Sequence, residues 1–262
     1  AETVIKFVDG AMEVFLKMVD IIMQAALFFV FALLAGTVSR MAGDDIGKVM
    51  EIFKGLSWYS LTVFIGLALM VFLIYPLIVK FLVKSISYTG FFKAMSPAQT
   101  LAFSTSSSAA TLPVTMECVE DNLGVDKKIT SFVLPIGATV NMDGTSLYQA
   151  VAVVFLAQFH MIDLDLGQQL TIVLTATLAS IGSAAVPSAG LVMLIIVLQS
   201  VGLNPAWIAI ILPVDRILDM CRTVVNVTGD ATVSSVIAEG EGLVHYDKSY
   251  SPDDTFEPDV NH

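Results

Sequence analysis

Apolar windows long enough to cross a bilayer constrain this chain more than any other feature of its sequence. One covers residues 19–38 (VDIIMQAALFFVFALLAGTV) and another covers residues 56–83 (LSWYSLTVFIGLALMVFLIYPLIVKFLV). Three more are centred near residues 131–160, 169–201 and 204–218. A membrane-spanning helix needs about 20 apolar residues, and only 14% of the residues are charged. We therefore expect an all-α polytopic membrane protein in contact with a lipid bilayer.

The two ends of the chain differ from this membrane portion. No methionine or signal peptide opens the sequence, so we expect the C-terminal portion of a longer protein, with residues 1–40 forming a scaffold membrane helix. Much of the net charge of −11 lies in residues 239–262, which we expect to be an acidic, flexible C-terminal tail. The two cysteines, Cys118 and Cys221, lie far apart in or near apolar stretches and are expected to be free thiols.

The distribution of basic residues predicts an orientation. Lysines flank the second window and the region after it, whereas aspartates occupy the connection at 161–168. By the positive-inside rule, residues 80–128 face the cytoplasm and residues 161–168 face outside. We expect a multi-pass protein of the cell (inner or plasma) membrane with a cytoplasmic C-terminus. The lysines are Lys80, Lys84, Lys93, Lys127 and Lys128, and the aspartates are Asp163 and Asp165.

Two segments are too polar at their centres to be simple spans. Residues 102–115 read AFSTSSSAATLPVT and residues 180–190 read SIGSAAVPSAG, and each joins apolar arms through serines, small residues and a proline. Non-helical backbone at membrane depth is tolerated where it is buried in protein or lines a polar cavity. Paired interrupted segments indicate a transporter's binding site. We expect two opposed re-entrant helical hairpins, over 90–123 and 167–202. Two kinked spanning helices packed through small residues are the alternative.

These segments predict how the membrane portion is organised. Residues 41–238 would form a transport core, in which the two hairpins alternate with helices over 56–84, 127–162 and 204–238. The last of these helices would carry a polar stripe for substrate and cations.

That stripe lies in the most polar of the apolar windows. Asp219, Arg222, Thr223, Asn226 and Asp230 are separated by three, one, three and four residues, which places them along one face of a helix. Ionisable residues inside a membrane segment are costly and therefore functional candidates. A guanidinium can hold a carboxylate through two hydrogen bonds, and a carboxylate can bind an ammonium group. The stripe predicts a site for an acidic amino acid, with a purely structural Asp219–Arg222 ion pair as the alternative.

The tetrapeptide NMDG at 141–144 predicts an unwound turn, because asparagine and glycine tolerate open backbone conformations. Carbonyl groups freed by such a turn, together with the side chains of Asn141 and Asp143, are hard oxygen ligands for a small cation. Asn226 and Asp230 could supply a second set. Oxygen ligands without cysteine or histidine fit sodium and not a transition metal. We expect no cofactor besides coupling ions and no nucleic-acid partner.

Four motifs in order resemble the dicarboxylate/amino acid:cation symporter family. They are SSSAATLPVT, LPIGATVNMDGTSLYQA, GSAAVPSAGLVMLIIVL and DMCRTVVNVTGD. That family includes the excitatory amino-acid transporters of animals and archaeal aspartate transporters. The resemblance runs from about residue 1 to Glu239, covers the C-terminal region of the family pattern, and is closest to prokaryotic sodium-coupled aspartate transporters. It implies a homotrimer that carries aspartate or glutamate with sodium by alternating access, and four earlier helices outside this sequence.

The resemblance also implies which residues hold the substrate. Asp219 would bind the amino group and Arg222 the side-chain carboxylate, while Thr223 and Asn226 would bind the α-carboxylate and the amino group. The first hairpin tip, a threonine of the unwound turn and the second tip, which acts as a gate, would complete the site. These residues are Ser106, Ser108, Thr145, Val186 and Gly190.

Three sodium sites are implied in the same way. One would combine the Asp230 carboxylate with backbone carbonyl groups, and another would centre on Asp143 and Asn141. The carbonyl groups of the former are those of Gly137, Asn141 and Asn226. The remaining site would use Thr139, Met142, Ser180, Ile181 and Ser183.

Three positions depart from the family pattern. Family members often carry an extra arginine, either at the first hairpin tip or directly after the aspartate equivalent to Asp219, but these positions are Ser106 and Met220 here. A gating or coupling role for that arginine is therefore not carried over. Gln149 stands where the animal glutamate transporters have a glutamate linked to proton transport, so we expect sodium coupling without potassium counter-transport.

We therefore expect a secondary active transporter and not an enzyme. The alternatives are a proton- or sodium-coupled C4-dicarboxylate symporter of the same fold and, from a different class, an anion or ion channel. Asp219 argues against succinate, which has no amino group, and Arg222 argues against neutral amino acids, which would leave its charge unpaired. A serine hydrolase would need a base beside the serine run, and the adjoining apolar segments contain no histidine or lysine.

Overall fold

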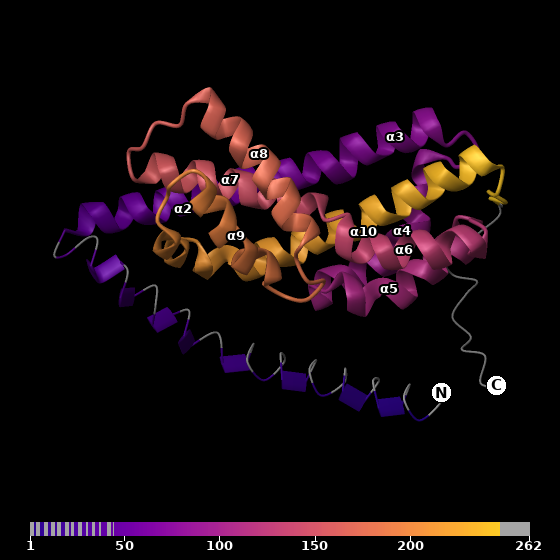
Figure 1. The fold of residues 1–262 in the computed structure, drawn as a ribbon, viewed down its shortest axis with the longest axis horizontal. Coiled ribbons are helices and arrows are strands. Elements are labelled where there is room, and N and C mark those ends of the chain that lie inside the picture. The colour runs from indigo at the N-terminus through magenta and orange to yellow at the C-terminus, as the bar shows by residue number, and fades with distance from the viewer. Residues whose placement is uncertain are drawn as a thin grey trace.

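The computed structural model describes residues 45–246 without a break and isolated positions between residues 3 and 43. Throughout this part the chain is helical and forms no β-strand, apart from one isolated antiparallel bridge between Val125 and Val244. Figure 1 shows helices packed side by side, with the shorter elements on either side of the last helix. The helix expected over 1–40 and most of the tail expected over 239–262 lie outside the described residues.

One continuous helix opens the described region. It consists of α2 (Ile46–Leu69), the π-helix η1 (Met70–Ile74) and α3 (Tyr75–Leu82). It begins earlier than the expected residue 56 because Asp45 caps it, accepting a hydrogen bond from the Gly47 N–H at 2.8 Å. The π-helical turn ends two residues before Pro76, which lacks the N–H that a regular helix needs. Within the described part, this is the helix long and apolar enough to cross a membrane.

Two helical hairpins follow the segments predicted for them. The first comprises α4 (Tyr88–Thr105), α5 (Ser108–Glu117) and the short π-helix η2 (Cys118–Asn122), and the second comprises α8 (Leu166–Ile181) and α9 (Ala189–Ser200). The arms of each hairpin pack against each other. Side-chain caps fix where the arms begin: Ser87 accepts from the Gly90 N–H, and Asp165 forms a capping box with Gln168.

A broken helix lies between the hairpins. The segment expected over 127–162 forms α6 (Lys127–Val140) and α7 (Asp143–Phe159), which are separated by Asn141 and Met142, and it leaves the helix after Phe159. Both separating residues have non-helical backbone angles, with ψ of 77° and 57°. The unwound turn expected at NMDG is therefore present, and it is confined to the first two residues of the motif.

The last helix, α10 (Leu212–Glu241), packs against α2, α3, α4, α5, α6 and α7. It begins later than the expected residue 204, because Pro205 starts a separate 3₁₀-helix, η3 (Pro205–Ile210), and Pro213 lies in the first turn of α10 where its missing N–H is tolerated. It ends at Gly242, a left-handed residue with φ of 70°.

Two apolar clusters surround this helix. One is built around Tyr59, Tyr148 and Leu194, and the other around Phe91 and Met95. The N-terminal half of α10 contributes to the first cluster and its C-terminal half to the second. Both cysteines are free thiols, as expected. The helix therefore passes through the protein with apolar packing at both ends and its polar residues turned inward.

Candidate functional site

The tips of the two hairpins touch. Ser107, between α4 and α5, donates a hydrogen bond from Oγ to the carbonyl oxygen of Ala185 in the second tip, at 2.7 Å. The Ala109 N–H donates to the same oxygen at 3.4 Å. Segments that lie far apart in the sequence are thus brought together next to α10.

Ser106 of the first tip has an unusual conformation. Its φ of 53° lies in the left-handed region, where residues other than glycine are uncommon. Its hydroxyl group is buried and has no hydrogen-bond partner in the described part of the chain. Strained backbone and an unpaired buried hydroxyl are typical of binding sites, and the substrate role expected for this serine stays a prediction.

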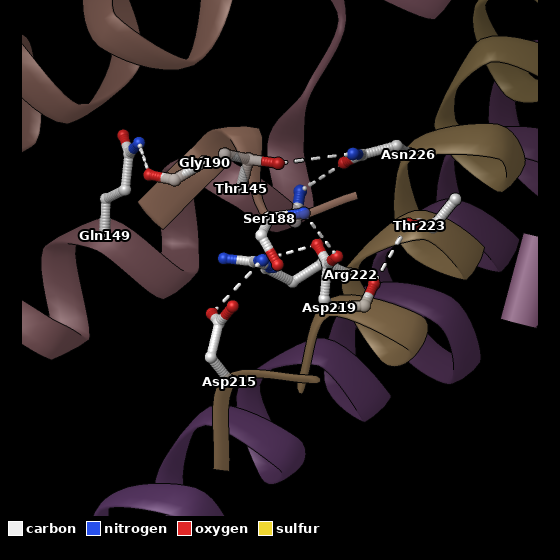
Figure 2. A network of polar contacts seen from close by, with 10 residues as sticks. Thr145, Gln149, Ser188, Gly190, Asp215, Asp219, Arg222, Thr223 and Asn226 are labelled. Carbon is white, nitrogen blue, oxygen red and sulfur yellow. Dashed lines mark hydrogen bonds and ion pairs between the residues drawn. The ribbon is translucent and has the colours of Figure 1, made fainter. Parts of the chain in front are cut away.

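Arg222 lies in a cluster of buried charges, which Figure 2 shows. Its Nη2 contacts the carboxylate of Asp219 and lies 3.4 Å from Oδ1 of Asp215. The guanidinium group lies over the Tyr148 ring, 3.9 Å from its centroid. The residue is only 1% exposed, and Nη1 and Nε have no hydrogen-bond partner among the described residues. Because buried donors are nearly always paired, these N–H groups favour a site that accepts an anion.

Asp219 connects this cluster to the second hairpin. Its Oδ2 accepts a hydrogen bond from the Ser188 N–H at 2.8 Å, and Ser188 has a left-handed φ of 60° directly before α9. The internal Asp219–Arg222 ion pair considered above does form. Both partners nevertheless face the second hairpin tip, so a movement of that tip changes the surroundings of both charges.

The second tip also contacts α7 at close range. Gln149 donates from Nε2 to the carbonyl oxygen of Gly190 at 2.8 Å. A Cβ atom on Gly190 would lie 2.7 Å from Cγ2 of Thr145 and 3.3 Å from Nη1 of Arg222. Only glycine permits this close approach, which explains why a residue without a side chain stands at the tip.

A small cavity lies between the tips and α10. Its volume is about 20 Å³, room for roughly one water molecule. All the residues expected to hold the substrate line this cavity, except Arg222, which is directed toward Asp215 and Tyr148. The lining residues are Ser106, Ser108, Met142, Thr145, Ser183, Ala184, Ala185, Val186, Gly190, Asp219, Thr223 and Asn226.

A second polar region lies where α10 crosses the broken helix. Asp230 is 3% exposed, and its Oδ1 accepts a hydrogen bond from Nδ2 of Asn141 at 2.9 Å. A Cβ atom on Gly137 would lie 2.6 Å from the same oxygen, so glycine lets this carboxylate lie against the backbone of α6. The Gly137 carbonyl oxygen still accepts a hydrogen bond from the Asn141 N–H at 2.8 Å, whereas the carbonyl groups that follow it in the last turn of α6 lose their helical partners at the break. These oxygen atoms suit a small, hard cation.

Two further contacts link this region to its neighbours. Tyr75 donates from its hydroxyl group to Oδ2 of Asp143 at 2.8 Å. The Asn226 side chain accepts from the Gly144 N–H at 2.9 Å and donates to Oγ1 of Thr145 at 3.3 Å. Asn226 thus fixes the start of α7, and it lies between the candidate substrate residues and the candidate cation residues.

The remaining expected cation ligands are only partly brought together. Met142, Ser180 and Ile181 line a cavity of about 510 Å³ that Asp143 also lines. Ser183 lines the small cavity between the tips instead. Thr139 is exposed, donates to its own helix at Ile136 O, and lines neither cavity.

Several residues of the site received no specific role from the sequence. Asp215 precedes Asp219 by four residues and Arg222 by seven, so the helical spacing that predicted the stripe could have included it. Tyr75 and Tyr148 stand in apolar windows and carry no signal of a polar role. Ser107 and Ser188 act through contacts between hairpins, which no local pattern predicts.

Comparison with known proteins places these features in a family. A sequence profile described as the sodium:dicarboxylate symporter family matches residues 1–239. An excitatory amino acid transporter of Caenorhabditis elegans is 42% identical over 95% of the chain and 47% of its own length. Excitatory amino acid transporter 1 of Rattus norvegicus is 44% identical over 88% of the chain and 42% of its length. Excitatory amino acid transporter 3 of Homo sapiens is 45% identical over 90% of the chain and 44% of its length. The chain thus spans less than half the length of these relatives.

Proposed function

The chain belongs to the sodium:dicarboxylate symporter family, and we propose that it forms the core of a transporter that carries an acidic amino acid together with sodium by alternating access. The names of its relatives support this class of substrate. The observation that carries the proposal is the buried guanidinium of Arg222, with Nη1 and Nε unpaired among the described residues, next to Asp219 and the second hairpin tip.

The charges of this cluster match an acidic amino acid. A guanidinium group binds a carboxylate with two parallel hydrogen bonds. The side-chain carboxylate of a bound aspartate would accept these hydrogen bonds from Arg222. Asp219 would exchange its contact with Arg222 for the ammonium group of the substrate. Hydroxyl and backbone groups of Ser106 and Ser108 would approach the substrate from the first tip. Since the site is shielded from water, each of these interactions is stronger than it would be in solution.

The second hairpin tip would act as the gate. Three hydrogen bonds hold it against the rest of the site: from Ser188 N to Asp219, from Gln149 to Gly190 O, and from Ser107 to Ala185 O. The cavity behind it is far smaller than an amino acid. Substrate entry would break these contacts, and closure of the tip over the substrate would precede movement of the core across the membrane.

Sodium would be coupled to the substrate through the broken helix. A cation bound by Asp230, with carbonyl oxygens of Gly137, Asn141 and Asn226, would offset the buried carboxylate. Asn226 also holds Gly144 and Thr145 through its side chain. When sodium orders this segment, it would also position the residues that bind the substrate. The substrate would then bind more tightly in the presence of sodium, which is positive coupling between the two sites.

The same proposal includes the arrangement in the membrane. The two hairpins would be re-entrant, with their tips at mid-membrane, in a multi-pass homotrimer of the cell membrane with a cytoplasmic C-terminus. The contact between the tips and the inward-facing polar residues of α10 support the re-entrant hairpins, because non-helical backbone at membrane depth needs protein around it.

Calorimetric titration of the purified protein with L-aspartate, L-glutamate and succinate, each with and without sodium, tests the function. We expect aspartate to bind only with sodium and to bind more tightly than succinate. Binding that does not depend on sodium contradicts the proposal, and succinate binding as tight as aspartate binding would favour the dicarboxylate carrier. A channel would conduct without the saturable, stoichiometric uptake of sodium and substrate expected in proteoliposomes.

Replacing Asp219 with asparagine should remove the preference for an amino group. The aspartate affinity is expected to fall by on the order of a hundredfold, since a buried charge pair loses one partner, while the succinate affinity is maintained or rises. The same titrations measure both. Asp163→Asn, in the exposed connection before α8, removes an equal charge and should change neither affinity. An equal fall in the affinities for aspartate and succinate would show that Asp219 does not bind the amino group.

Replacing Gln149 with glutamate should make substrate binding depend on pH. Gln149 donates to the Gly190 carbonyl oxygen, and a glutamate can donate there only when it is protonated. Aspartate binding should therefore weaken as the pH rises, by up to about tenfold per pH unit once the new carboxyl group ionises. Titrations between acidic and alkaline pH measure this change. Gln158→Glu, an exposed position on the same helix, is the matched control, and an equal pH dependence in both variants would refute the role of Gln149.

A further inference from the structure

A groove runs along the outer side of α3 at the end of the continuous helix. Its volume is about 450 Å³. Its apolar wall is formed by Phe72, Leu73, Pro76 and Leu77, which follow one face of the helix. Phe72 is 65% exposed and Leu73 is 47% exposed, although they belong to the segment apolar enough to span a membrane. None of the functional groups discussed above lines this groove.

Two lysines close the groove at its polar end. Lys80 lies in the last turn of α3 and Lys84 lies just beyond the end of the helix, and both line the same cavity. Among the described residues, neither ammonium group forms an ion pair with a carboxylate. Lys80 lies 6.0 Å from the centroid of the Phe81 ring. The nearby carboxylate of Glu239 accepts a hydrogen bond from the backbone N–H of Lys84 at 3.1 Å, and Glu239 does not line the groove. The polar end therefore carries positive charge.

We propose that this groove binds one anionic phospholipid, with an acyl chain along the apolar wall and the phosphate group between Lys80 and Lys84. The inference rests on the proposed membrane embedding of the helix and not on its transport activity. Basic side chains next to a membrane span attract anionic lipids of the cytoplasmic leaflet, and the lysine distribution predicts that this end of the helix lies on that side.

The dimensions of the groove fit a lipid. The helix ends at Leu82, and from Phe72 to that residue it rises by about 15 Å, which is comparable to one leaflet of a hydrocarbon core about 30 Å thick. A free phosphate ion would use the lysines but would gain nothing from the apolar wall. A second, wholly apolar membrane helix would cover the wall but would leave the two ammonium groups without a partner. A phospholipid satisfies both parts at once.

Native mass spectrometry of the purified protein tests the proposal, in detergent micelles that contain dioleoyl phosphatidylglycerol or dioleoyl phosphatidylcholine. Aspartate and sodium are left out, so the result does not depend on the proposed transport. We expect phosphatidylglycerol to be retained in preference to phosphatidylcholine. The variant K80Q/K84Q should weaken phosphatidylglycerol binding by on the order of tenfold or more.

Two further variants separate the contributions. K127Q/K128Q removes the same charge from two exposed lysines. These lie at the same end of the molecule, since the N–H of the preceding Asp126 donates to the carbonyl oxygen of Leu243, four residues after Glu239. It should leave lipid binding unchanged. L77W fills the apolar wall, keeps both lysines and should weaken binding of both lipids.

Any of four results would overturn the proposal. These are equal retention of the two lipids, an equal loss in K127Q/K128Q, undiminished phosphatidylglycerol binding in L77W, and no lipid bound to the unaltered protein. The third result would indicate a phosphate site without a lipid chain. The fourth, together with a change of oligomeric state in K80Q/K84Q, would indicate a second protein chain as the occupant.

Discussion

Replacing Arg222 with alanine is expected to abolish sodium-dependent aspartate binding, with an affinity at least on the order of a hundredfold lower. The guanidinium group is buried and forms ion pairs with Asp215 and Asp219. Without it the side-chain carboxylate of the substrate would enter a site that holds two like charges. Calorimetric titration in sodium measures the loss.

A destabilised fold could cause the same loss, so a second variant is needed. Removing Arg222 alone leaves two buried carboxylates unpaired, which costs about 3–5 kcal/mol. The double variant R222M/D215N keeps the formal charge of the cluster, because one cation and one anion are removed together. We expect it to unfold at a temperature close to that of the unaltered protein and still fail to bind aspartate. A folded double variant with unaltered aspartate affinity would refute the role of Arg222.

Replacing Asp230 with asparagine should change sodium binding and stability in opposite directions. The carboxylate is buried, accepts a hydrogen bond from Asn141 and makes no ion pair with any described residue. A bound sodium ion would offset its charge. The sodium concentration needed for half-maximal aspartate binding should therefore rise by roughly two orders of magnitude. In sodium-free buffer the variant should be the more stable protein, since a neutral amide is less costly to bury than a carboxylate.

Thermal unfolding at a series of sodium concentrations checks both parts of this prediction. Sodium should raise the unfolding temperature of the unaltered protein, because an ion that binds only the folded state stabilises it, and should have little effect on Asp230→Asn. Asp163→Asn, which removes an exposed carboxylate, should respond to sodium like the unaltered protein. A full sodium response in Asp230→Asn would place the coupling ion elsewhere.

Much of the helix pattern was predictable because it depends on local sequence. The two serine- and proline-containing breaks fall where α4 meets α5 and where α8 meets α9. The unwound turn expected at NMDG lies at Asn141 and Met142. Errors arose at helix ends, where a single residue decides whether a helix begins. Because of the Asp45 cap, α2 begins earlier than expected, and because of Pro205 and Pro213, α10 begins later than expected.

The polar stripe of the last helix was also predictable. Residues three and four apart in a helix share a face whatever surrounds them. Asp219, Arg222, Thr223, Asn226 and Asp230 all lie on the buried side of α10. The ligand roles assigned to them remain predictions, as does the expected similarity to the prokaryotic branch of the family.

By itself, the sequence determined the kind of element at each place and the residue types that face inward, because apolar length, proline and helical spacing act over a few neighbouring residues. Only the tertiary structure decided which distant groups meet. Ser107 meets Ala185 across 78 residues, Asp219 meets Ser188 across 31, and Asn141 meets Asp230 across 89. These contacts depend on how whole helices pack around α10, and on glycines such as Gly137 and Gly190 that let them approach. The candidate site is therefore a product of packing, built from parts that the sequence alone could identify but not assemble.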